Sequence, residues 1–268
     1  MRHAYLIALA GLAACEQPTA APKAAAPAAT VAKAGPATIY GCLDGKTLRA
    51  AYPDSDTAVL MVEGRKLTLK VARSGSGARY VGEGVQWWTK GMTEGTLSVL
   101  KAGEDVADAE GVYCSTTPLP AVEPPAPGAP GGLPDDRTPI SEAPFTPTSA
   151  QGAANVVQTY YAHIGEKDYA AAWKLWRGGG AASNQTQAEF AQGFARYAAY
   201  NAQVGAPGLT DGAAGSLYIE VPVVIYGRMM NGAELHQSGK VILKRINDVP
   251  GSTAQERLWG ISQIELKP

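Results

Sequence analysis

Residues 57–71 read TAVLMVEGRKLTLKV and carry the clearest structural signal in the chain. In KLTLKV (66–71), apolar residues alternate with lysine or threonine, which is the two-residue period of a strand with one buried face. Thr57–Val62 is a second run of aliphatic and β-branched residues, and Glu63-Gly64 between the two runs predicts a tight turn. The stretch therefore predicts two antiparallel strands joined by a short connection.

Similar short strands are expected on both sides of this stretch, separated by glycine-bearing turns such as Gly82-Glu83-Gly84. They are Thr47–Tyr52, Ala78–Glu83, Val85–Lys90 and Glu94–Leu100. Many short strands at this spacing favour a small antiparallel barrel or a sandwich, and we expect a barrel over residues 38–116. Side chains fill the interior of so small a barrel, so its function rests on its loops.

Two segments rich in alanine and proline separate the barrel from its surroundings. Residues 15–37 have almost no large apolar side chain and are typical of a disordered tether. Residues 117–148 contain many prolines, which predicts an extended, semi-rigid linker rather than a packed element.

The remaining part, residues 149–268, has an α+β pattern in which helices precede strands. Apolar residues at three- and four-residue spacing predict a first helix that ends at Gly165, and Asp168 is a suitable N-cap for a second. The expected helices after the first are Tyr169–Trp176 and Thr186–Tyr200, and the expected strands are Ser216–Met229, Glu234–Ile246 and Leu258–Leu266.

The N-terminus has the features of an export signal. A short basic start precedes an apolar run that is too short to span a bilayer, so residues 1–14 are expected to be a signal peptide. Leu12-Ala13-Ala14-Cys15 resembles the bacterial lipobox, which implies acyl chains such as palmitate on Cys15. Glu16, rather than aspartate, favours the outer membrane, so we expect a lipid-anchored protein of the cell envelope facing the periplasm.

With Cys15 assigned to lipid, Cys42 and Cys114 remain of the 3 cysteines. An oxidising compartment favours a disulfide bond between them over two buried free thiols. Such a bond would bring their Cα atoms within about 4.4–6.8 Å. The net charge of −1 argues against nucleic acid as a partner, and no metal or cofactor site is expected.

Two motifs of the predicted barrel are specific in combination. Residues 74–80 read SGSGARY and residues 87–91 read WWTKG, inside a segment that opens with Tyr40-Gly41-Cys42 and closes with Tyr113-Cys114. Over residues 39–115 the chain resembles the family of membrane-bound lysozyme inhibitors of C-type lysozyme. The resemblance implies a protein that is not an enzyme and whose partner is C-type lysozyme.

By residue match, the resemblance places Ser76 and Lys90 at the binding site, where they would meet the two catalytic carboxylates of lysozyme. Ser74 lies in the same glycine-rich loop and is the second candidate for the inserted hydroxyl. Arg79 is expected to face solvent as an accessory contact. Tyr80 is a further candidate contact, although Tyr80, Trp87 and Trp88 fit a core better, with one tryptophan at the rim.

The C-terminal part resembles the NTF2-like α+β cone through Tyr160-Tyr161, the KDYAAAW run at 167–173 and the late strands that end at Trp259. Its ionisable candidates, His163, Asp168 and His236, form no recognisable catalytic dyad, so a binding module is expected. Two alternatives stay open. One is an envelope adaptor that binds protein or glycan through this domain without inhibiting lysozyme, and the other is an enzyme with its pocket in the cone.

Overall fold

The structure, a computed structural model, describes residues 36–108, 110–135, 146–213 and 215–268. The expected signal peptide, Cys15 and nearly all of the tether lie outside the described residues. Within the described part, no helix is both long enough and apolar enough to cross a membrane.

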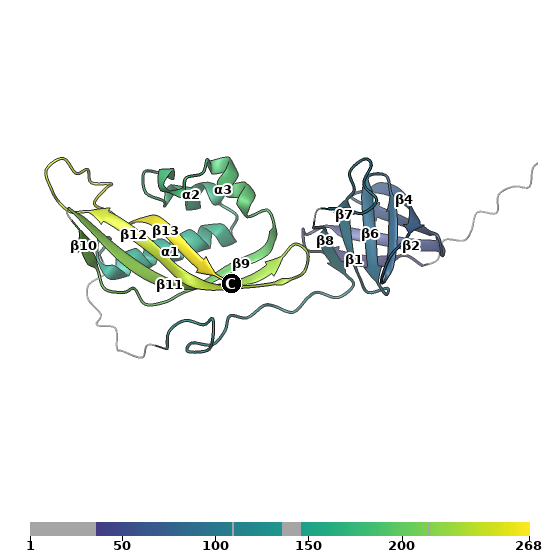
Figure 1. The fold of residues 1–268 in the computed structure, drawn as a ribbon, viewed down its shortest axis with the longest axis horizontal. Coiled ribbons are helices and arrows are strands. Elements are labelled where there is room, and N and C mark those ends of the chain that lie inside the picture. Colours follow the sequence, from purple (N-terminus) through teal and green to yellow (C-terminus); the bar gives the residue numbers. More distant parts are fainter. Residues whose placement is uncertain (1–35, 109, 136–145, 214) are drawn as a thin grey trace, which may run out of the picture. The chain divides into compact units, whose positions relative to one another are not determined.

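The N-terminal domain is a closed barrel of eight antiparallel strands in sequence order, with β1 pairing with β8 (Figure 1). The strands are β1 (Thr38–Cys42), β2 (Thr47–Asp54), β3 (Thr57–Val62), β4 (Arg65–Ala72), β5 (Ala78–Gly82), β6 (Val85–Lys90), β7 (Glu94–Val99) and β8 (Val112–Ser115). The predicted barrel is confirmed, and the six predicted strands form β2 to β7. The sequence did not predict β1 and β8 as strands, although these two close the barrel.

The barrel interior is filled by aromatic and aliphatic side chains, among which Trp87 of β6 is fully buried. Its ring meets Tyr40 edge-on at 5.3 Å between centroids, and its indole nitrogen donates a hydrogen bond of 2.9 Å to the Tyr52 hydroxyl. Gly95 on β7 leaves room for this indole, because a Cβ there would lie 2.6 Å from the ring. The core therefore depends on a glycine next to the largest side chain, in a position diagonal to it on the neighbouring strand.

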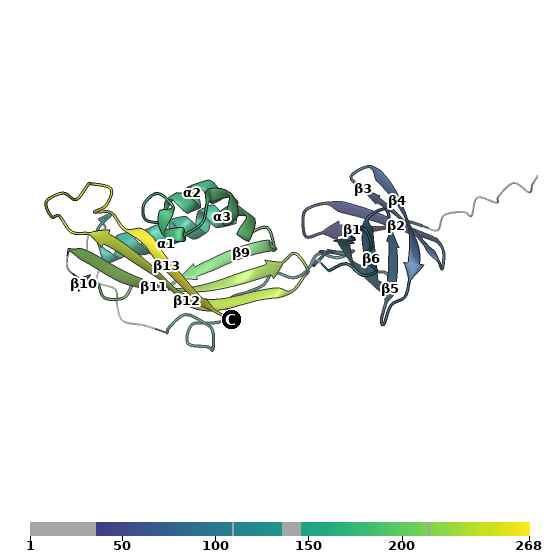
Figure 2. The same cartoon turned by 45° about the horizontal axis from the view of Figure 1, so that its top comes forward.

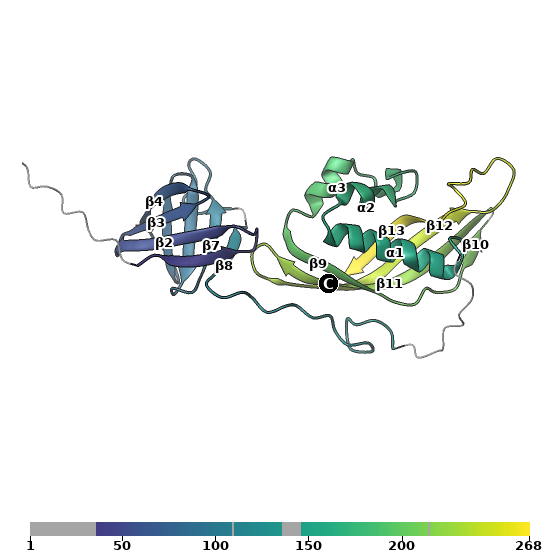
Figure 3. The ribbon, with the colours of Figure 1, turned by 180° about the vertical axis from the view of Figure 1, so that it is seen from behind.

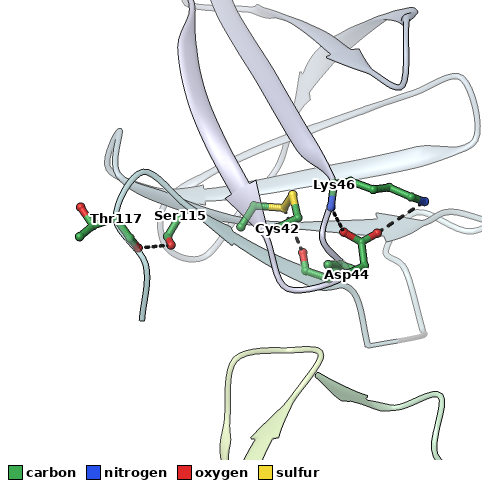
Figure 4. The surroundings of a disulfide bond; sticks show 7 residues. Cys42, Asp44, Lys46, Ser115 and Thr117 are labelled. Carbon is green, nitrogen blue, oxygen red and sulfur yellow. Dashed lines mark hydrogen bonds and ion pairs between the residues drawn. A yellow bond between two sulfur atoms is a disulfide. The ribbon is translucent and has the colours of Figure 1, made fainter. Parts of the chain in front are cut away.

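A disulfide bond joins Cys42 of β1 to Cys114 of β8, as predicted (Figure 4). The two residues are direct partners in the antiparallel register, so the bond fastens the strand pair that closes the barrel. Their Cα atoms are 4.0 Å apart, slightly below the expected range of about 4.4–6.8 Å. In the adjacent turn, Asp44 accepts from the backbone amide of Lys46 and pairs with its ammonium.

The C-terminal domain places helices on one face of a five-stranded antiparallel sheet, as the views from front and back show (Figures 1 and 3). The core lies between these layers, so the predicted α+β class is confirmed. Figure 2 shows the same helices after a 45° turn. The elements are α1 (Ala150–Gly165), α2 (Tyr169–Lys174), the 3-10 helix η1 (Ala181–Ser183), α3 (Gln187–Gly193), β9 (Tyr197–Val204), β10 (Asp211–Ala213), β11 (Ser216–Met229), β12 (Glu234–Ile246) and β13 (Gly260–Lys267).

The predicted helix Thr186–Tyr200 is wrong in its second half. Thr186 caps α3 and forms a capping box with Glu189, but the helix ends at Gly193. Residues from Tyr197 onward form β9, which pairs with β11. The aromatic spacing that suggested one helix therefore spans a helix, a turn and a strand.

The expected linker contains no helix or strand over its described residues, 117–135 and 146–148. It is nevertheless not a free spacer. Arg228 of β11 donates a hydrogen bond of 2.9 Å to the Pro120 carbonyl oxygen. The Leu133 side chain lies close to Gly205, since a Cβ added to Gly205 would be 3.1 Å from the Leu133 Cδ2. Turns such as Gly128 N–H to Leu133 C=O, at 2.8 Å, fold the segment locally. These contacts hold parts of the segment against the C-terminal domain, and its role as a linker stays a prediction.

Candidate functional site

The candidate site is built from the loop between β4 and β5 and from the end of β6. The register pairs Ala78 with Thr89, so the residues just before β5 lie beside the residues that end β6. Ser76 and Lys90 are consequently at the same end of the barrel, as the predicted hairpin required. Both side chains are exposed.

The Ser76 backbone is held in place by two donors. The Trp88 indole nitrogen donates to the Ser76 carbonyl oxygen at 2.8 Å, and the Ser74 hydroxyl donates to the same oxygen at 2.6 Å. Of the two candidate serines, Ser74 therefore uses its hydroxyl within the loop. Among the described residues, no hydrogen bond engages the Ser76 hydroxyl, which stays available to a partner.

Gly77 makes this close approach possible. Its φ of +67° is in the left-handed region that favours glycine, and a Cβ would collide with the carbonyl oxygen of Thr89. A Cβ added to Gly75, by contrast, would meet nothing within 4 Å in the described part of the chain. The two glycines that flank Ser76 therefore differ: one is required by the local geometry and the other is open to substitution.

Lys90 presents an exposed ammonium group beside this loop. Its cross-strand partner is Glu94, whose carboxylate accepts a hydrogen bond of 2.6 Å from the Tyr113 hydroxyl. Burial, with the bond to Glu94, raises the pKa of Tyr113 to about 12, so this phenol remains a donor at neutral pH. No ion pair engages Lys90 within the described part of the chain, and its charge is free for an external anion.

Ser76 and Lys90 also line one hollow on the barrel surface, together with Gln86 and Trp88 of β6 and Thr96 of β7. The hollow offers a half-buried aromatic surface between a hydroxyl and a cation. Trp88 is therefore the tryptophan at the rim, while Trp87 belongs to the core. The sequence analysis expected one tryptophan at the rim without saying which, and it did not reveal the role of Trp88 in holding the loop.

The expectation that Arg79 faces solvent was wrong, because only 6% of this residue is exposed. Its guanidinium donates to the carbonyl oxygens of Arg73 and Asp105 and to the Gln86 side chain. Strand alternation does place Arg79 on the outside of the barrel, but the segment around Asp105 covers it. Arg79 thus ties this segment and the start of the Ser76 loop to the barrel wall.

Tyr80 is 7% exposed and packs against Tyr52, with 5.6 Å between the ring centroids. It points into the barrel, as expected for a core residue. Tyr80 therefore exposes almost no surface with which it could contact a protein partner directly.

The three ionisable candidates of the C-terminal domain have separate local roles. Asp168 caps α2 by accepting from the Ala171 amide at 3.0 Å, as predicted. His163 lies 4.0 Å from Glu166, and His236 lies 3.5 Å from Glu234. Over the described ranges, no side-chain hydrogen bond or ion pair joins any two of the three candidates, and no group of three or more His, Cys, Asp or Glu is placed to hold a metal ion.

Comparisons with known proteins agree with the motifs of the barrel. A curated relative from Cupriavidus necator, named membrane-bound lysozyme inhibitor of C-type lysozyme, is 44% identical over 73 residues, which are 26% of this chain and 58% of the relative. The chain thus spans less than two thirds of that protein. No solved structure gives a significant match. Residues 40–105, which contain the loop of Ser76 and the strand of Lys90, match the sequence model of the family described as membrane-bound lysozyme-inhibitor of c-type lysozyme.

Proposed function

We propose that the barrel inhibits C-type lysozyme by inserting Ser76 and Lys90 into its catalytic cleft. One observation carries the proposal: the Ser76 backbone is pinned by two hydrogen bonds, while its hydroxyl is exposed and unpartnered among the described residues. A loop that is already ordered loses little conformational freedom on binding, which favours affinity. The match of residues 40–105 to the inhibitor family supports the same target.

The chemistry of the target suits these two groups. Lysozyme uses two carboxylates that flank the scissile sugar bond, one as general acid and one as nucleophile or stabiliser. The Ser76 hydroxyl donates a hydrogen bond to one carboxylate, and the Lys90 ammonium forms a charge-assisted bond with the other. Trp88 covers the space between them. The cleft is then closed to substrate, and neither carboxylate is left desolvated without a partner.

The test is inhibition of peptidoglycan hydrolysis by the full chain carrying Cys15→Ala, which removes the proposed lipid site. Ser76→Ala should weaken inhibition by about 1.5–3 kcal/mol, the usual value of a hydrogen bond to a charged group. Lys90→Ala should weaken it by about 2–5 kcal/mol, mainly through faster dissociation.

Lys66→Ala, an exposed lysine on β4, is the matched control and should inhibit like the parent chain. Undiminished inhibition by both Ser76→Ala and Lys90→Ala would refute the site. A parent chain that folds but does not inhibit would favour the envelope adaptor instead.

The proposed location is the bacterial cell envelope, with a lipid on Cys15 that anchors the protein in the outer membrane. The motif Leu12-Ala13-Ala14-Cys15 supports it, as does the membrane-bound relative. Cys15→Ala should abolish acylation and leave a soluble or uncleaved species in detergent partitioning, and mass spectrometry of the natural N-terminus should find an acylated cysteine. An unmodified N-terminus elsewhere in the chain would contradict the anchor.

For the C-terminal domain we propose an NTF2-like cone that acts as a binding module rather than as an enzyme. Its helices on one face of an antiparallel sheet support this architecture. The separate partners of His163, Asp168 and His236 support a role without catalysis.

A further inference from the structure

A small hollow in the C-terminal domain combines aromatic rings with one cation. It has a volume of about 180 Å³ and lies where the end of α1 and the start of α2 meet the end of α3 and β9. The side chains that define its chemistry are Lys167, Tyr169, Phe194, Tyr197, Tyr200 and Asn201. Among the residues that the structure describes, no acidic one lines the hollow.

The aromatic wall is ordered by mutual packing. Tyr169 stacks on Phe194 at 5.3 Å with an interplanar angle of 11°, and Tyr200 meets Phe194 edge-on at 5.3 Å. Tyr197 in turn meets Tyr200 at 4.9 Å. These rings present a rigid apolar surface, which can accept the face of a ring-shaped ligand without first being ordered.

Lys167 occupies a backbone position that normally suits glycine. It follows the C-cap of α1 with φ +62°, and the amides of Lys167 and Asp168 donate to the carbonyl oxygens of Ile164 and His163 at 3.0 and 2.8 Å. This is the Schellman arrangement, in which glycine is the preferred residue at the left-handed position. A lysine there is unfavourable for the helix end, yet it makes a cationic residue part of the lining of the hollow.

Some polar groups near the hollow make no hydrogen bond within the described residues, although the Tyr197 hydroxyl accepts one of 2.7 Å from Arg196. Burial raises the pKa of Tyr200, so its phenol stays protonated and can donate a hydrogen bond at any physiological pH. Behind it, the ring of Tyr161 lies 6.4 Å from that of Tyr200, and the buried Tyr161 hydroxyl has no hydrogen-bond partner within the described residues. Asn201 adds an amide to the lining. The unpartnered Tyr161 hydroxyl can donate or accept a hydrogen bond, and Lys167 is the cationic residue of the lining.

We propose that this hollow binds a small ligand whose carboxylate is attached, directly or through a short substituent, to a six-membered ring, the carboxylate pairing with Lys167 and the ring resting on the aromatic wall. Aromatic lining with a few convergent polar groups is the usual composition of a small-molecule site, and the absence of acids from the described lining favours an anion. Two sources share this chemistry, an acidic amino sugar of the peptidoglycan type and an aromatic acid. The proposal is independent of lysozyme inhibition by the barrel.

The test measures binding to the full chain carrying Cys15→Ala by ligand-observed NMR, with probes at millimolar concentration. N-acetylmuramic acid and benzoate are the carboxylate probes, and N-acetylglucosamine is the matched sugar without the carboxylate. At least one carboxylate probe should bind, and N-acetylglucosamine should bind at least about tenfold more weakly than N-acetylmuramic acid if the sugar is the ligand. Preference for benzoate would identify an aromatic acid as the source.

Lys167→Gly is the decisive variant, because it removes the ammonium while relieving the left-handed strain. It should fold with an unchanged or higher Tm and lose binding of the carboxylate probe at least about tenfold. Lys174→Ala, an exposed lysine at the end of α2, should bind like the parent. Failure of both carboxylate probes to bind, or full binding by Lys167→Gly, would overturn the proposal.

Discussion

The Trp88 indole nitrogen donates a hydrogen bond of 2.8 Å to the carbonyl oxygen of Ser76, twelve residues earlier in the chain. This bond connects the outer face of β6 to the loop that carries the proposed inhibitory serine. A half-buried tryptophan thus fixes the backbone of a residue whose own side chain stays free. The Ser76 carbonyl oxygen holds the loop in place, and the hydroxyl of the same residue remains available to a partner.

Trp88→Phe removes this donor while it keeps an aromatic ring in place. We expect weaker lysozyme inhibition by about 0.5–1.5 kcal/mol, the net value of one neutral hydrogen bond, because the Ser76 loop becomes less ordered. The Tm should change little, since the ring lies at the surface of the barrel. Inhibition constants together with thermal unfolding check both parts.

The neighbouring Trp87→Phe is the contrasting variant. Trp87 is fully buried and donates to Tyr52, so its loss should lower the Tm clearly through a core cavity and an unpaired hydroxyl. A Trp88→Phe protein that unfolds as easily as Trp87→Phe would show that Trp88 serves the core and not the loop.

Arg79 is expected to act on stability rather than on binding. Arg79→Met keeps the side-chain length but leaves the carbonyl oxygens of Arg73 and Asp105 without their donor. We expect the free energy of unfolding to fall by about 1–3 kcal/mol. Inhibition per folded molecule should fall less than in Lys90→Ala. Denaturant unfolding and inhibition assays on the same samples separate the effect on stability from the effect on binding. Lost inhibition at unchanged stability would show that Arg79 contacts lysozyme after all.

Local patterns in the sequence were sufficient for most of the barrel. Alternation with a period of two and glycine-bearing turns identified β2 to β7, and the pairing of β5 with β6 followed from their short connection. The closing strands β1 and β8 are short, and each borders a segment rich in alanine and proline. Neither strand therefore has a turn on that side by which its end could be recognised. Their pairing with each other is a long-range contact between residues such as Cys42 and Cys114.

Long-range packing also explains the errors. The spacing of Phe190, Phe194 and Tyr197 fits a helix locally, but pairing with β11 holds Tyr197 in a strand. Arg79 was correctly placed on the outer side of β5 by alternation, yet nothing local indicates that the segment at Asp105 covers it. The placement of Ser76 beside Lys90 was predictable because it needs only one hairpin. The bond from Trp88 to the Ser76 carbonyl was not, because it depends on the loop conformation.

The disulfide bond should contribute much of the stability of the barrel. Cys42→Ala combined with Cys114→Ala removes a crosslink between residues 72 positions apart. The chain-entropy model assigns about 4 kcal/mol to a loop of this size, and removing a native disulfide typically costs about 2–5 kcal/mol. Thermal unfolding with and without a reductant is the measurement. The reductant should lower the Tm of the parent towards that of the double variant and leave the variant itself unchanged; equal Tm values for parent and variant would contradict the role.

The two glycines beside Ser76 give the sharpest test of the loop conformation. Gly77→Ala places a methyl group against the Thr89 carbonyl oxygen and forces a left-handed backbone on alanine, which costs about 1–2 kcal/mol before any clash is counted. The loop should move away from β6 and lose its bond to Trp88. We therefore expect reduced stability and reduced inhibition together.

Gly75→Ala is the matched control, because its added Cβ meets nothing within 4 Å among the described residues and its φ is not in the left-handed region. Its free energy of unfolding should stay within about 0.5 kcal/mol of the parent, as for other surface substitutions. The difference in unfolding free energy between the two variants therefore reports the left-handed backbone of Gly77 and its contact with Thr89 together, apart from the general effect of replacing a glycine. If Gly77→Ala and Gly75→Ala were equally stable, the loop would not be packed against β6, and the pre-ordered presentation of Ser76 would lose its basis.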